Sequence, residues 1–261
     1  MIDQPAAKKS LGQHWLEDPV SLAAMLVAAD VQPDDTVLEI GPGLGSLTSL
    51  LVEAADQVIA VELDDVLVAK LPKAVPATNL QIVHQSILEF DFTNLPPNYK
   101  IVANIPYYLT SHLLRNLSQT PNPAAQAALL MQKEVAERAA AGPGAMSLLS
   151  VSLQFYWEVS LGRLVPAELF SPPPKVDSQI LRLVRRDEPL FTDVDEKQFF
   201  RLVRLGFAQR RKTILNSLGS GLHLSRQEIT ACCMEAGIEP TARAQILSLQ
   251  EWHQLYLVLN T

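Results

Sequence analysis

The sequence predicts an α/β protein with a parallel, doubly wound sheet, followed by a small all-α C-terminal domain. Three observations lead to this prediction. Apolar runs alternate with helical stretches through the first half of the chain, glycines follow the first such run, and strand signals stop beyond Arg186. With 261 residues, 48% of them hydrophobic, the chain is long enough to bury its own core.

The alternation begins with a helix, because Asp18 is a preferred capping residue, Pro19 suits the first turn and an apolar stretch follows. Strands are then predicted at residues 36–40, 57–62, 80–84, 100–104 and 126–131, with helices at 44–54 and 64–73 and after the last two strands. Strands separated by helices pair in parallel through right-handed crossovers. Two β-rich runs, 155–161 and 179–184, flank the Pro172-Pro173-Pro174 turn, and we expect them to finish the sheet as an antiparallel edge.

Helical patterns dominate after the last strand signal. They cover residues 195–206, 210–218, 225–236 and 244–259. We therefore place a domain boundary near residue 188, with domains at 1–188 and 189–261. In a helix from residue 195, Lys197, Arg201 and Arg204 share one face. Apolar side chains share the other face: Phe199, Leu202 and Val203.

The net charge of −7 hides a basic segment. Residues 1–180 carry 10 Lys or Arg against 19 Asp or Glu, whereas residues 181–261 carry 11 against 9. Between residues 199 and 212 there are five cations and no acid: Arg201, Arg204, Arg210, Arg211 and Lys212. Electrostatic binding of a phosphate backbone requires a local cluster of this kind, so we expect these residues to bind nucleic acid.

Cysteine, histidine and apolar patterns restrict the protein class. Cys232 and Cys233 are adjacent and cannot form a disulfide framework, which favours a reducing compartment. The first ten residues lack the apolar core of a signal peptide, and the longest uncharged run, 139–157, contains Gly142-Pro143-Gly144. The five histidines show no ligand spacing. We expect a cytoplasmic protein without membrane segment or metal, and a monomer, because no apolar patch demands a dimer.

A glycine-rich turn and an acidic strand end predict a nucleoside-containing cofactor. Gly41, Gly43 and Gly45 follow the first strand, where glycines let a ligand approach the backbone. Glu62 ends the second strand, 21 positions after Gly41, and an acid there can accept both ribose hydroxyls. The glycine spacing differs from that of pyrophosphate binders, and no Walker lysine follows. S-adenosylmethionine, which has adenosine without pyrophosphate, fits best.

The segment Asn104-Ile105-Pro106-Tyr107 ends the fourth predicted strand. The exocyclic amine of a base is a poor nucleophile, because its lone pair is delocalised into the ring. The side-chain oxygen of Asn104 and a neighbouring backbone carbonyl can accept both N–H bonds and turn the lone pair towards a methyl donor. Tyr107 can stack on the ring and hold it.

Six segments in order along the chain resemble the KsgA family of ribosomal RNA adenine dimethyltransferases: residues 9–16, 38–45, 104–107, 132–138, 170–178 and 209–213. The resemblance covers almost the whole chain. It implies a Rossmann-like methyltransferase domain that uses S-adenosylmethionine, and a small helical C-terminal domain that binds RNA. An amine inside a helix is out of reach, so the target adenine would be unpaired or flipped out.

The resemblance also implies roles for single residues in cofactor binding. His14 and Leu16 would line the cofactor site, and Gly41 would contact the methionine end, with Gly43 in the same site. Glu62 would hold the ribose. These roles agree with those derived from the glycine turn and from the strand end.

On the substrate side, the resemblance implies that Asn104 and Pro106 take the target amine. Asn104 would also belong to the cofactor site. Tyr107 and Phe170 would sandwich the flipped adenine. Phe170 rests on the resemblance alone, since an aromatic residue before a proline turn is more often part of a core.

The chain departs from the family pattern at Ala145-Met146-Ser147, where a Tyr-Gly pair is common, and at two positions of the cofactor site. His14 stands where asparagine is commoner, although either side chain can hydrogen-bond a carboxylate. Ser86 stands where an aspartate usually accepts from the adenine amine of the cofactor. A serine hydroxyl accepts without charge, so we expect cofactor binding to be weaker by roughly 1 kcal/mol.

Three functions remain open at this point. The first is dimethylation of two adjacent adenines in the 3′-terminal hairpin of small-subunit rRNA, within a pre-30S particle, which segments 172–178 and 209–213 favour. The second is the related large-subunit adenine methylation that confers macrolide resistance. The third is a non-catalytic ribosome-assembly or transcription factor on the same fold, against which the intact motif at Asn104 argues.

Overall fold

The computed structural model describes Lys8 and residues 12–209 and 211–260, so Arg210 and segment 9–11 of the first motif lie outside the described residues. The chain divides into two compact units. Unit one contains the residues up to Ala136 together with Glu158–Arg185, and unit two contains Glu137–Trp157 and the residues from Arg186 onward. The domain boundary near residue 188 stays a prediction. The last point at which the chain passes from unit one to unit two, between Arg185 and Arg186, lies close to it. The segment Glu137–Trp157 belongs to the helical unit.

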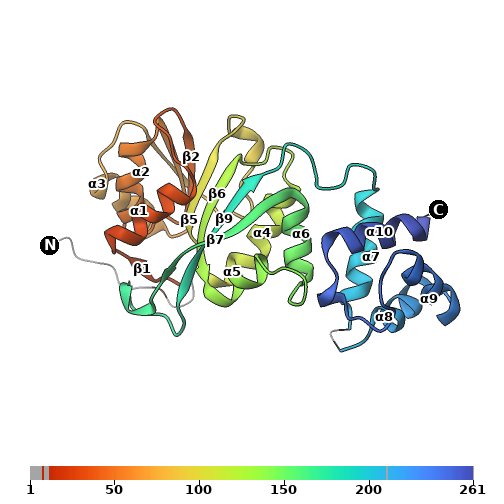
Figure 1. Cartoon of the computed structure of the whole chain (residues 1–261). Helices are drawn as coiled ribbons and strands as arrows, with labels where there is room; N and C mark the ends of the chain where they lie inside the picture. Colours follow the sequence, from red (N-terminus) through yellow and green to blue (C-terminus); the bar gives the residue numbers. More distant parts are fainter. Residues whose placement is uncertain (1–7, 9–11, 210, 261) are drawn as a thin grey trace. The chain divides into compact units, whose positions relative to one another are not determined.

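Unit one is built on a seven-stranded sheet with the order β4-β3-β2-β5-β6-β9-β7 (Figure 1). The strands from β4 to β6 are parallel, and β9 is antiparallel to β6. Their bounds are β2 (Thr36–Ile40), β3 (Gln57–Glu62), β4 (Leu80–His84), β5 (Lys100–Asn104), β6 (Gln126–Gln132), β7 (Trp157–Val165) and β9 (Ser178–Arg185). The predicted fold class, including the antiparallel edge, is confirmed.

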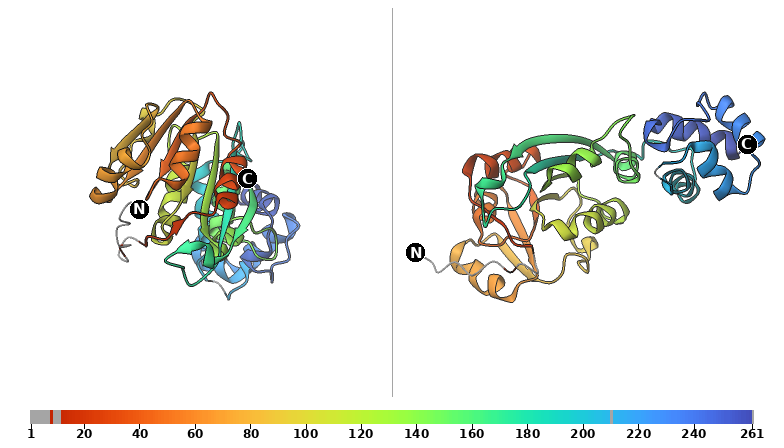
Figure 2. Two further views of the ribbon diagram at one scale, coloured as in Figure 1. Left: turned by 90° about the vertical axis from the view of Figure 1, so that its left-hand side faces the viewer. Right: turned by 90° about the horizontal axis from the view of Figure 1, so that it is seen from below.

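Helices cover both faces of the sheet (Figures 1 and 2). Their bounds are α1 (Pro19–Ala28), α2 (Ser46–Ala54), α3 (Asp65–Ala74), α4 (Thr110–Gln119) and α5 (Lys133–Ala139). Asp18 caps α1 by accepting a hydrogen bond from Ser21 N, which confirms the predicted start of the first helix. Asp64 caps α3 in the same way through Val66 N.

The core of unit one forms where side chains of alternate strand residues meet the helices. Met25 of α1 and Leu51 of α2 are fully buried against one face of the sheet, in a cluster that includes Val37, Val58 and Val102. These three valines occupy neighbouring parallel strands, where both faces are covered. This packing holds the carboxyl ends of β2, β3 and β5 in register at one edge.

A small second sheet in unit one was not predicted. β1 (Trp15–Leu16) pairs antiparallel with β8 (Phe170–Ser171), with Leu16 opposite Phe170. Two-residue strands leave no periodic pattern, so sequence reasoning had no signal for them. The pairing fixes the segment before α1 beside the segment that follows β7.

Unit two is helical, with an aromatic core around Phe155, Phe199 and Trp252, all fully buried. Its helices are α6 (Leu148–Tyr156), α7 (Glu196–Phe207), α8 (Ile214–Leu222), α9 (Arg226–Glu235) and α10 (Leu249–Asn260). Short 3-10 helices occur at Phe92–Asn94, Tyr107–Leu109 and Ala167–Leu169 in unit one and at Ala244–Ile246 in unit two.

Three predicted elements are wrong in detail. Phe155 and Tyr156 end α6 instead of opening a strand, because aromatic residues suit a buried helix face as well as a strand. The helix predicted at 210–218 begins only at Ile214, where Thr213 supplies the cap by accepting from Asn216 N. The helix predicted at 244–259 is a 3-10 turn followed by α10.

Candidate functional site

A cavity in unit one opens at the carboxyl ends of β2, β3 and β5, where doubly wound sheets bind their ligands. All ten residues that the sequence predicted to hold the cofactor or the target base line it: His14, Leu16, Gly41, Gly43, Glu62, Ser86, Asn104, Pro106, Tyr107 and Phe170. The structure therefore brings these residues together, while their individual roles remain predictions.

The turn after β2 has an open side towards the cavity. Gly41 and Gly43 have φ values of +68° and +60°, in the left-handed region that favours glycine. A Cβ atom on Gly43 would lie 2.8 Å from Cζ3 of Trp15, so only glycine allows the indole ring to pack here. A Cβ atom on Gly41 would meet nothing within 4 Å, which leaves space for a ligand to approach the backbone.

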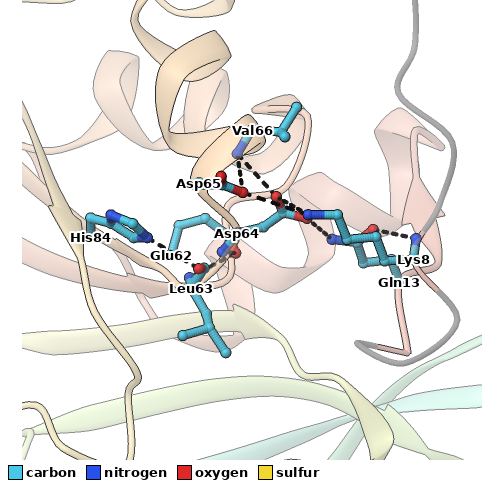
Figure 3. A network of polar contacts seen from close by, with 8 residues as sticks. All are labelled: Lys8, Gln13, Glu62, Leu63, Asp64, Asp65, Val66 and His84. Atoms are coloured by element: carbon cyan, nitrogen blue, oxygen red, sulfur yellow. Dashed lines mark hydrogen bonds and ion pairs between the residues drawn. The ribbon is translucent and has the colours of Figure 1, made fainter.

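Glu62 is held by backbone amides at the end of β3. Its Oε1 accepts hydrogen bonds from Leu63 N and Asp64 N, both at 2.8 Å (Figure 3). Within the described part of the chain, its Oε2 accepts only a long bond of 3.4 Å from Gly43 N, so this oxygen keeps lone pairs for ligand hydroxyls. Burial raises the pKa of Glu62, and the backbone hydrogen bonds oppose that rise.

The segment before β1 is tied to Asp64, the capping residue of α3 (Figure 3). Lys8 Nζ lies 2.8 Å from Asp64 Oδ1, and Gln13 Nε2 donates to Asp64 Oδ2 at 3.0 Å. Burial alone would raise the pKa of Asp64, but the hydrogen bonds from Lys8, Gln13 and Val66 N, together with the charge of Lys8, hold the pKa below its ordinary value. Sequence reasoning missed this anchor, because 56 positions separate Lys8 from Asp64.

Asn104 and Tyr107 face the cavity from the end of β5. Asn104 Nδ2 donates to the carbonyl oxygen of His14 at 3.2 Å, which fixes the amide so that Oδ1 is the group left to accept. The ring of Tyr107 stacks on the His14 ring, with centroids 5.8 Å apart. The hydroxyl of Tyr107 lies 3.1 Å from that of Ser178, at the start of β9.

Phe170 and Ser86 differ in how far they are available to a ligand. Phe170 is only 4% exposed and packs in the core of unit one, although it also lines the cavity. Ser86 is half-buried in the loop after β4, and its Oγ accepts from Leu88 N at 3.3 Å. The Ser86 hydroxyl keeps a second lone pair that can accept from a ligand, as well as its proton.

Glu39 was not singled out from the sequence, yet it lines the cavity. It is the fourth residue of β2, is 1% exposed, and neither of its carboxyl oxygens has a hydrogen-bond partner among the described residues. Burial raises its pKa to about 8. The sequence does contain a signal that could have identified Glu39: a single acidic residue inside an apolar strand that directly precedes the glycine turn.

Four of the five predicted RNA-binding cations are exposed in unit two: Arg201, Arg204, Arg211 and Lys212. Arg201 and Arg204 lie on α7, opposite the buried Phe199, Leu202 and Val203, as the helical pattern predicted. None of the four is paired with an acid in the described part of the chain. Arg210, the fifth, lies outside the described residues.

Residues 8, 12–209 and 211–260 contain neither a candidate metal centre nor a candidate membrane helix. No three side chains of His, Cys, Asp and Glu there gather in a way that could hold a metal ion. No helix in that part of the chain combines the length and the hydrophobicity that a membrane crossing requires.

A family model described as ribosomal RNA adenine dimethylase matches residues 5–261. The chain belongs to this family. A relative from Dehalococcoides mccartyi, named ribosomal RNA small subunit methyltransferase A, is 46% identical over 258 residues, which cover 97% of this chain and 88% of the relative. A protein of the same name from Streptococcus equi subsp. zooepidemicus is 40% identical and covers 95% of this chain and 90% of its own.

Two solved structures resemble this adenine dimethylase over nearly its full length. The 23S rRNA methyltransferase ErmE is 30% identical, with a TM-score of 0.79, and the match covers 95% of this chain and all of that one. A dimethyladenosine transferase from Plasmodium falciparum is 26% identical, with a TM-score of 0.78, and the match covers 95% of this chain and 98% of that one.

Family membership confirms the predicted enzyme class and cofactor: the protein is a ribosomal RNA adenine dimethyltransferase that uses S-adenosylmethionine. The cavity fits this cofactor on its own observations. The open side of Gly41 admits a ligand to the backbone, Glu62 Oε2 has accepting capacity, and the orphaned carboxyl of Glu39 suits a cationic ligand.

Proposed function

We propose that this adenine dimethylase transfers methyl groups to two adjacent adenines in the 3′-terminal hairpin of small-subunit rRNA, within a pre-30S particle. The choice of small-subunit rRNA as substrate rests on sequence identity, which is higher to small-subunit methyltransferases than to a 23S rRNA methyltransferase. Proteins named ribosomal RNA small subunit methyltransferase A are 40% and 46% identical to the chain, whereas the 23S rRNA methyltransferase ErmE is 30% identical. We take the enzyme to act as a monomer in the cytoplasm.

We assign the cofactor contacts to residues around the glycine turn. S-adenosylmethionine, when bound, supplies a methyl group carried on a sulfonium cation. Glu62 Oε2 accepts from the ribose hydroxyls, and the backbone at Gly41 and Gly43 meets the methionine end. Ser86 hydrogen-bonds the adenine of the cofactor, and His14 and Leu16 line the same site.

The target amine is assigned to Asn104 and Pro106. The amide oxygen of Asn104 accepts one N–H of the adenine amine, since its nitrogen is already held by His14 O. The carbonyl oxygen of Pro106 accepts from Leu109 N at 3.0 Å and has a second lone pair for the other N–H. Both bonds would orient the nitrogen lone pair towards the methyl group that S-adenosylmethionine would supply there, and the amine proton would be lost to solvent.

The flipped adenine ring is assigned to Tyr107 and Phe170. Tyr107 is the better supported of the two, because its ring is fixed at both ends by His14 and Ser178. Phe170 lines the cavity from the core, where it is already packed. RNA outside the cavity is held by its phosphates, through Arg201, Arg204, Arg210, Arg211 and Lys212.

The test is transfer of labelled methyl groups from S-adenosylmethionine to unmethylated small ribosomal subunits, beside protein-free large-subunit RNA. The wild type and Asn104→Ala are compared. We expect dimethyladenosine in small subunits only, with a loss of at least about 100-fold in the variant, because orientation and hydrogen bonding to the reacting amine are both removed.

The other two functions are outcomes of the same test. Preferential labelling of large-subunit RNA would replace the substrate proposal and leave the chemistry intact. RNA binding without any transfer by the wild type would establish a binding factor instead and overturn the assigned roles of Asn104 and Tyr107.

A further inference from the structure

The segment between β8 and β9 lies beside two residues that line the cavity. This proline loop, residues 172–177, is held near both of its ends. Nδ1 of His14 lies 2.7 Å from the carbonyl oxygen of Pro172. The hydroxyl of Ser178, directly after the loop, lies 3.1 Å from that of Tyr107. The loop therefore starts and ends beside the stacked rings of His14 and Tyr107, which both line the cavity.

The proline loop is restrained before any ligand arrives. Oδ1 of Asp177 accepts a hydrogen bond from Ala167 N at 3.0 Å, and the carbonyl oxygen of Asp177 accepts from Lys133 N at 3.0 Å. Three consecutive prolines each hold their φ at about −65° in the first half of the loop. A restrained segment loses little conformational entropy when a ligand docks on it, so the loop is suited to binding.

The tip of the proline loop exposes a cation next to an apolar side chain. Lys175 is exposed and pairs with no acid among the described residues. Val176 is apolar, yet it is 46% exposed. The acid of the loop, Asp177, is half-buried and engaged with Ala167 N, so the tip carries one positive charge. A nucleotide presents the complementary groups, a phosphate and the flat face of a base.

Base flipping places a nucleotide of this kind at the cavity. The family acts on adenines of ribosomal RNA, and an adenine amine reaches the cavity only when its base leaves the stack. The base that adjoins the target then loses a stacking partner, which costs free energy. An apolar side chain that covers the uncovered face offsets part of this cost. The phosphate between the two nucleotides stays close to the flipped base, because it is covalently joined to it.

We propose that the proline loop is the subsite for the nucleotide that adjoins the flipped adenine, with Lys175 bound to its phosphate and Val176 packed against the face of its base. The proposed substrate has two adjacent adenines, and this inference rests on that proposal. A purine offers a larger face to Val176 than a pyrimidine does. The subsite therefore favours RNA in which a purine adjoins the target.

Methyl transfer to unmethylated small ribosomal subunits tests the role of Val176. Besides the natural rRNA, two altered rRNAs are used, in which uridine replaces one or the other adenine. For the wild type we expect a KM several-fold higher with at least one altered subunit. In Val176→Ser the KM for natural subunits should rise several-fold, and uridine should add nothing further, because side chain and base act as a pair. Val27→Ser is the matched control, since Val27 is also exposed, on α1; it should behave as the wild type does.

The salt dependence of binding to the same natural subunits tests the role of Lys175. In Lys175→Gln we expect the slope of log affinity against log salt to fall by about 1, since one phosphate is no longer neutralised. Lys73→Gln is the control, because Lys73 is an exposed lysine of unit one on α3. The slope should not change in that variant, and both variants should keep the affinity of the wild type for S-adenosylmethionine.

Three results would overturn the subsite while the proposed substrate stands. These are a wild type whose KM is indifferent to uridine, the same effect of uridine in the wild type and in Val176→Ser, and an unchanged salt slope in Lys175→Gln. Failure of the wild type to methylate natural small subunits would instead refute the proposed substrate, and this inference with it.

Discussion

The hydroxyl of Tyr107 lies 3.1 Å from the hydroxyl of Ser178, although 71 positions separate the two residues. Tyr107 follows β5 and Ser178 begins β9, and β6 lies between these two strands in the sheet. The other end of the tyrosine is fixed by stacking of its ring on His14. A side chain restrained at both ends loses little further freedom when it holds a base, which is what orientation at the target amine requires.

We predict that Ser178→Ala and Tyr107→Phe each lower kcat for methyl transfer by several-fold, with unchanged affinity for S-adenosylmethionine. Each variant removes one partner of the same hydrogen bond and leaves the tyrosine ring freer to turn. Steady-state kinetics of both variants and of their combination form a double-mutant cycle. The combination should be no slower than the worse single variant; losses that multiply would show that the two hydroxyls act separately.

The raised pKa of Glu39 predicts how stability depends on pH. A carboxyl group whose pKa is higher in the folded state than in the unfolded state holds its proton more tightly when the protein is folded. Its contribution to the free energy of unfolding is complete below the unfolded-state pKa, and it is lost as pH rises through the folded-state pKa. For Glu39 that window runs from 4.5 to about 8. Urea unfolding without cofactor should therefore show a free energy of unfolding that falls across this window, by at most about 1.4 kcal/mol per pH unit. Glu39→Gln should flatten this slope, and an equal slope in the variant would contradict the assignment.

Asp64 has two structural roles: it caps α3, and it binds the segment that contains Gln13. Two substitutions separate these roles. Asp64→Ala removes both, and we expect a loss of about 1 kcal/mol in stability through the missing cap of α3. Asp64→Ser keeps a capping oxygen but loses the partner of Lys8 and Gln13. Both variants should bind S-adenosylmethionine several-fold more weakly, because Gln13, His14 and Leu16 line the cavity. Full affinity in Asp64→Ser would show that the anchor does not position the cofactor site.

We predict that Ser86→Asp tightens binding of S-adenosylmethionine by roughly 1 kcal/mol, the difference between a neutral and a charge-assisted hydrogen bond. Ser86 lies in the cavity wall after β4, half-buried, so the new carboxylate would retain part of its hydration. Isothermal calorimetry checks the change, and Ser86→Asn controls for side-chain size without charge. Unchanged or weaker binding by Ser86→Asp would place the adenine of the cofactor elsewhere.

Local rules predicted most of the fold. The cap at Asp18, the apolar strand runs and the glycine turn are encoded within a few residues, and the structure reproduces them closely. Phe155 was assigned to a strand because helices and strands can both bury an aromatic residue, and only packing against Phe199 decides between them. The site shows the same division. Glu62 and Asn104 could be predicted as site residues because each ends a strand. The roles of Ser178 and Asp64 depend instead on contacts between segments that are distant in the sequence.

The basic residues of unit two give the last prediction. Arg211 and Lys212 are exposed after α7 and unpaired with any acid among the described residues. If they bind RNA phosphates, Arg211→Glu with Lys212→Glu should weaken binding of small-subunit rRNA. The slope of log affinity against log salt should also fall, by about 1 for each phosphate that the variant no longer neutralises. Affinity for S-adenosylmethionine should not change.

Arg226→Glu with Arg243→Glu reverses the same number of exposed charges in the same unit and serves as the control. Equal effects of the two double variants would mean that net charge alone steers the RNA. A loss of affinity specific to Arg211 and Lys212 would instead locate the RNA-binding surface, since screened charges far from the phosphates contribute little.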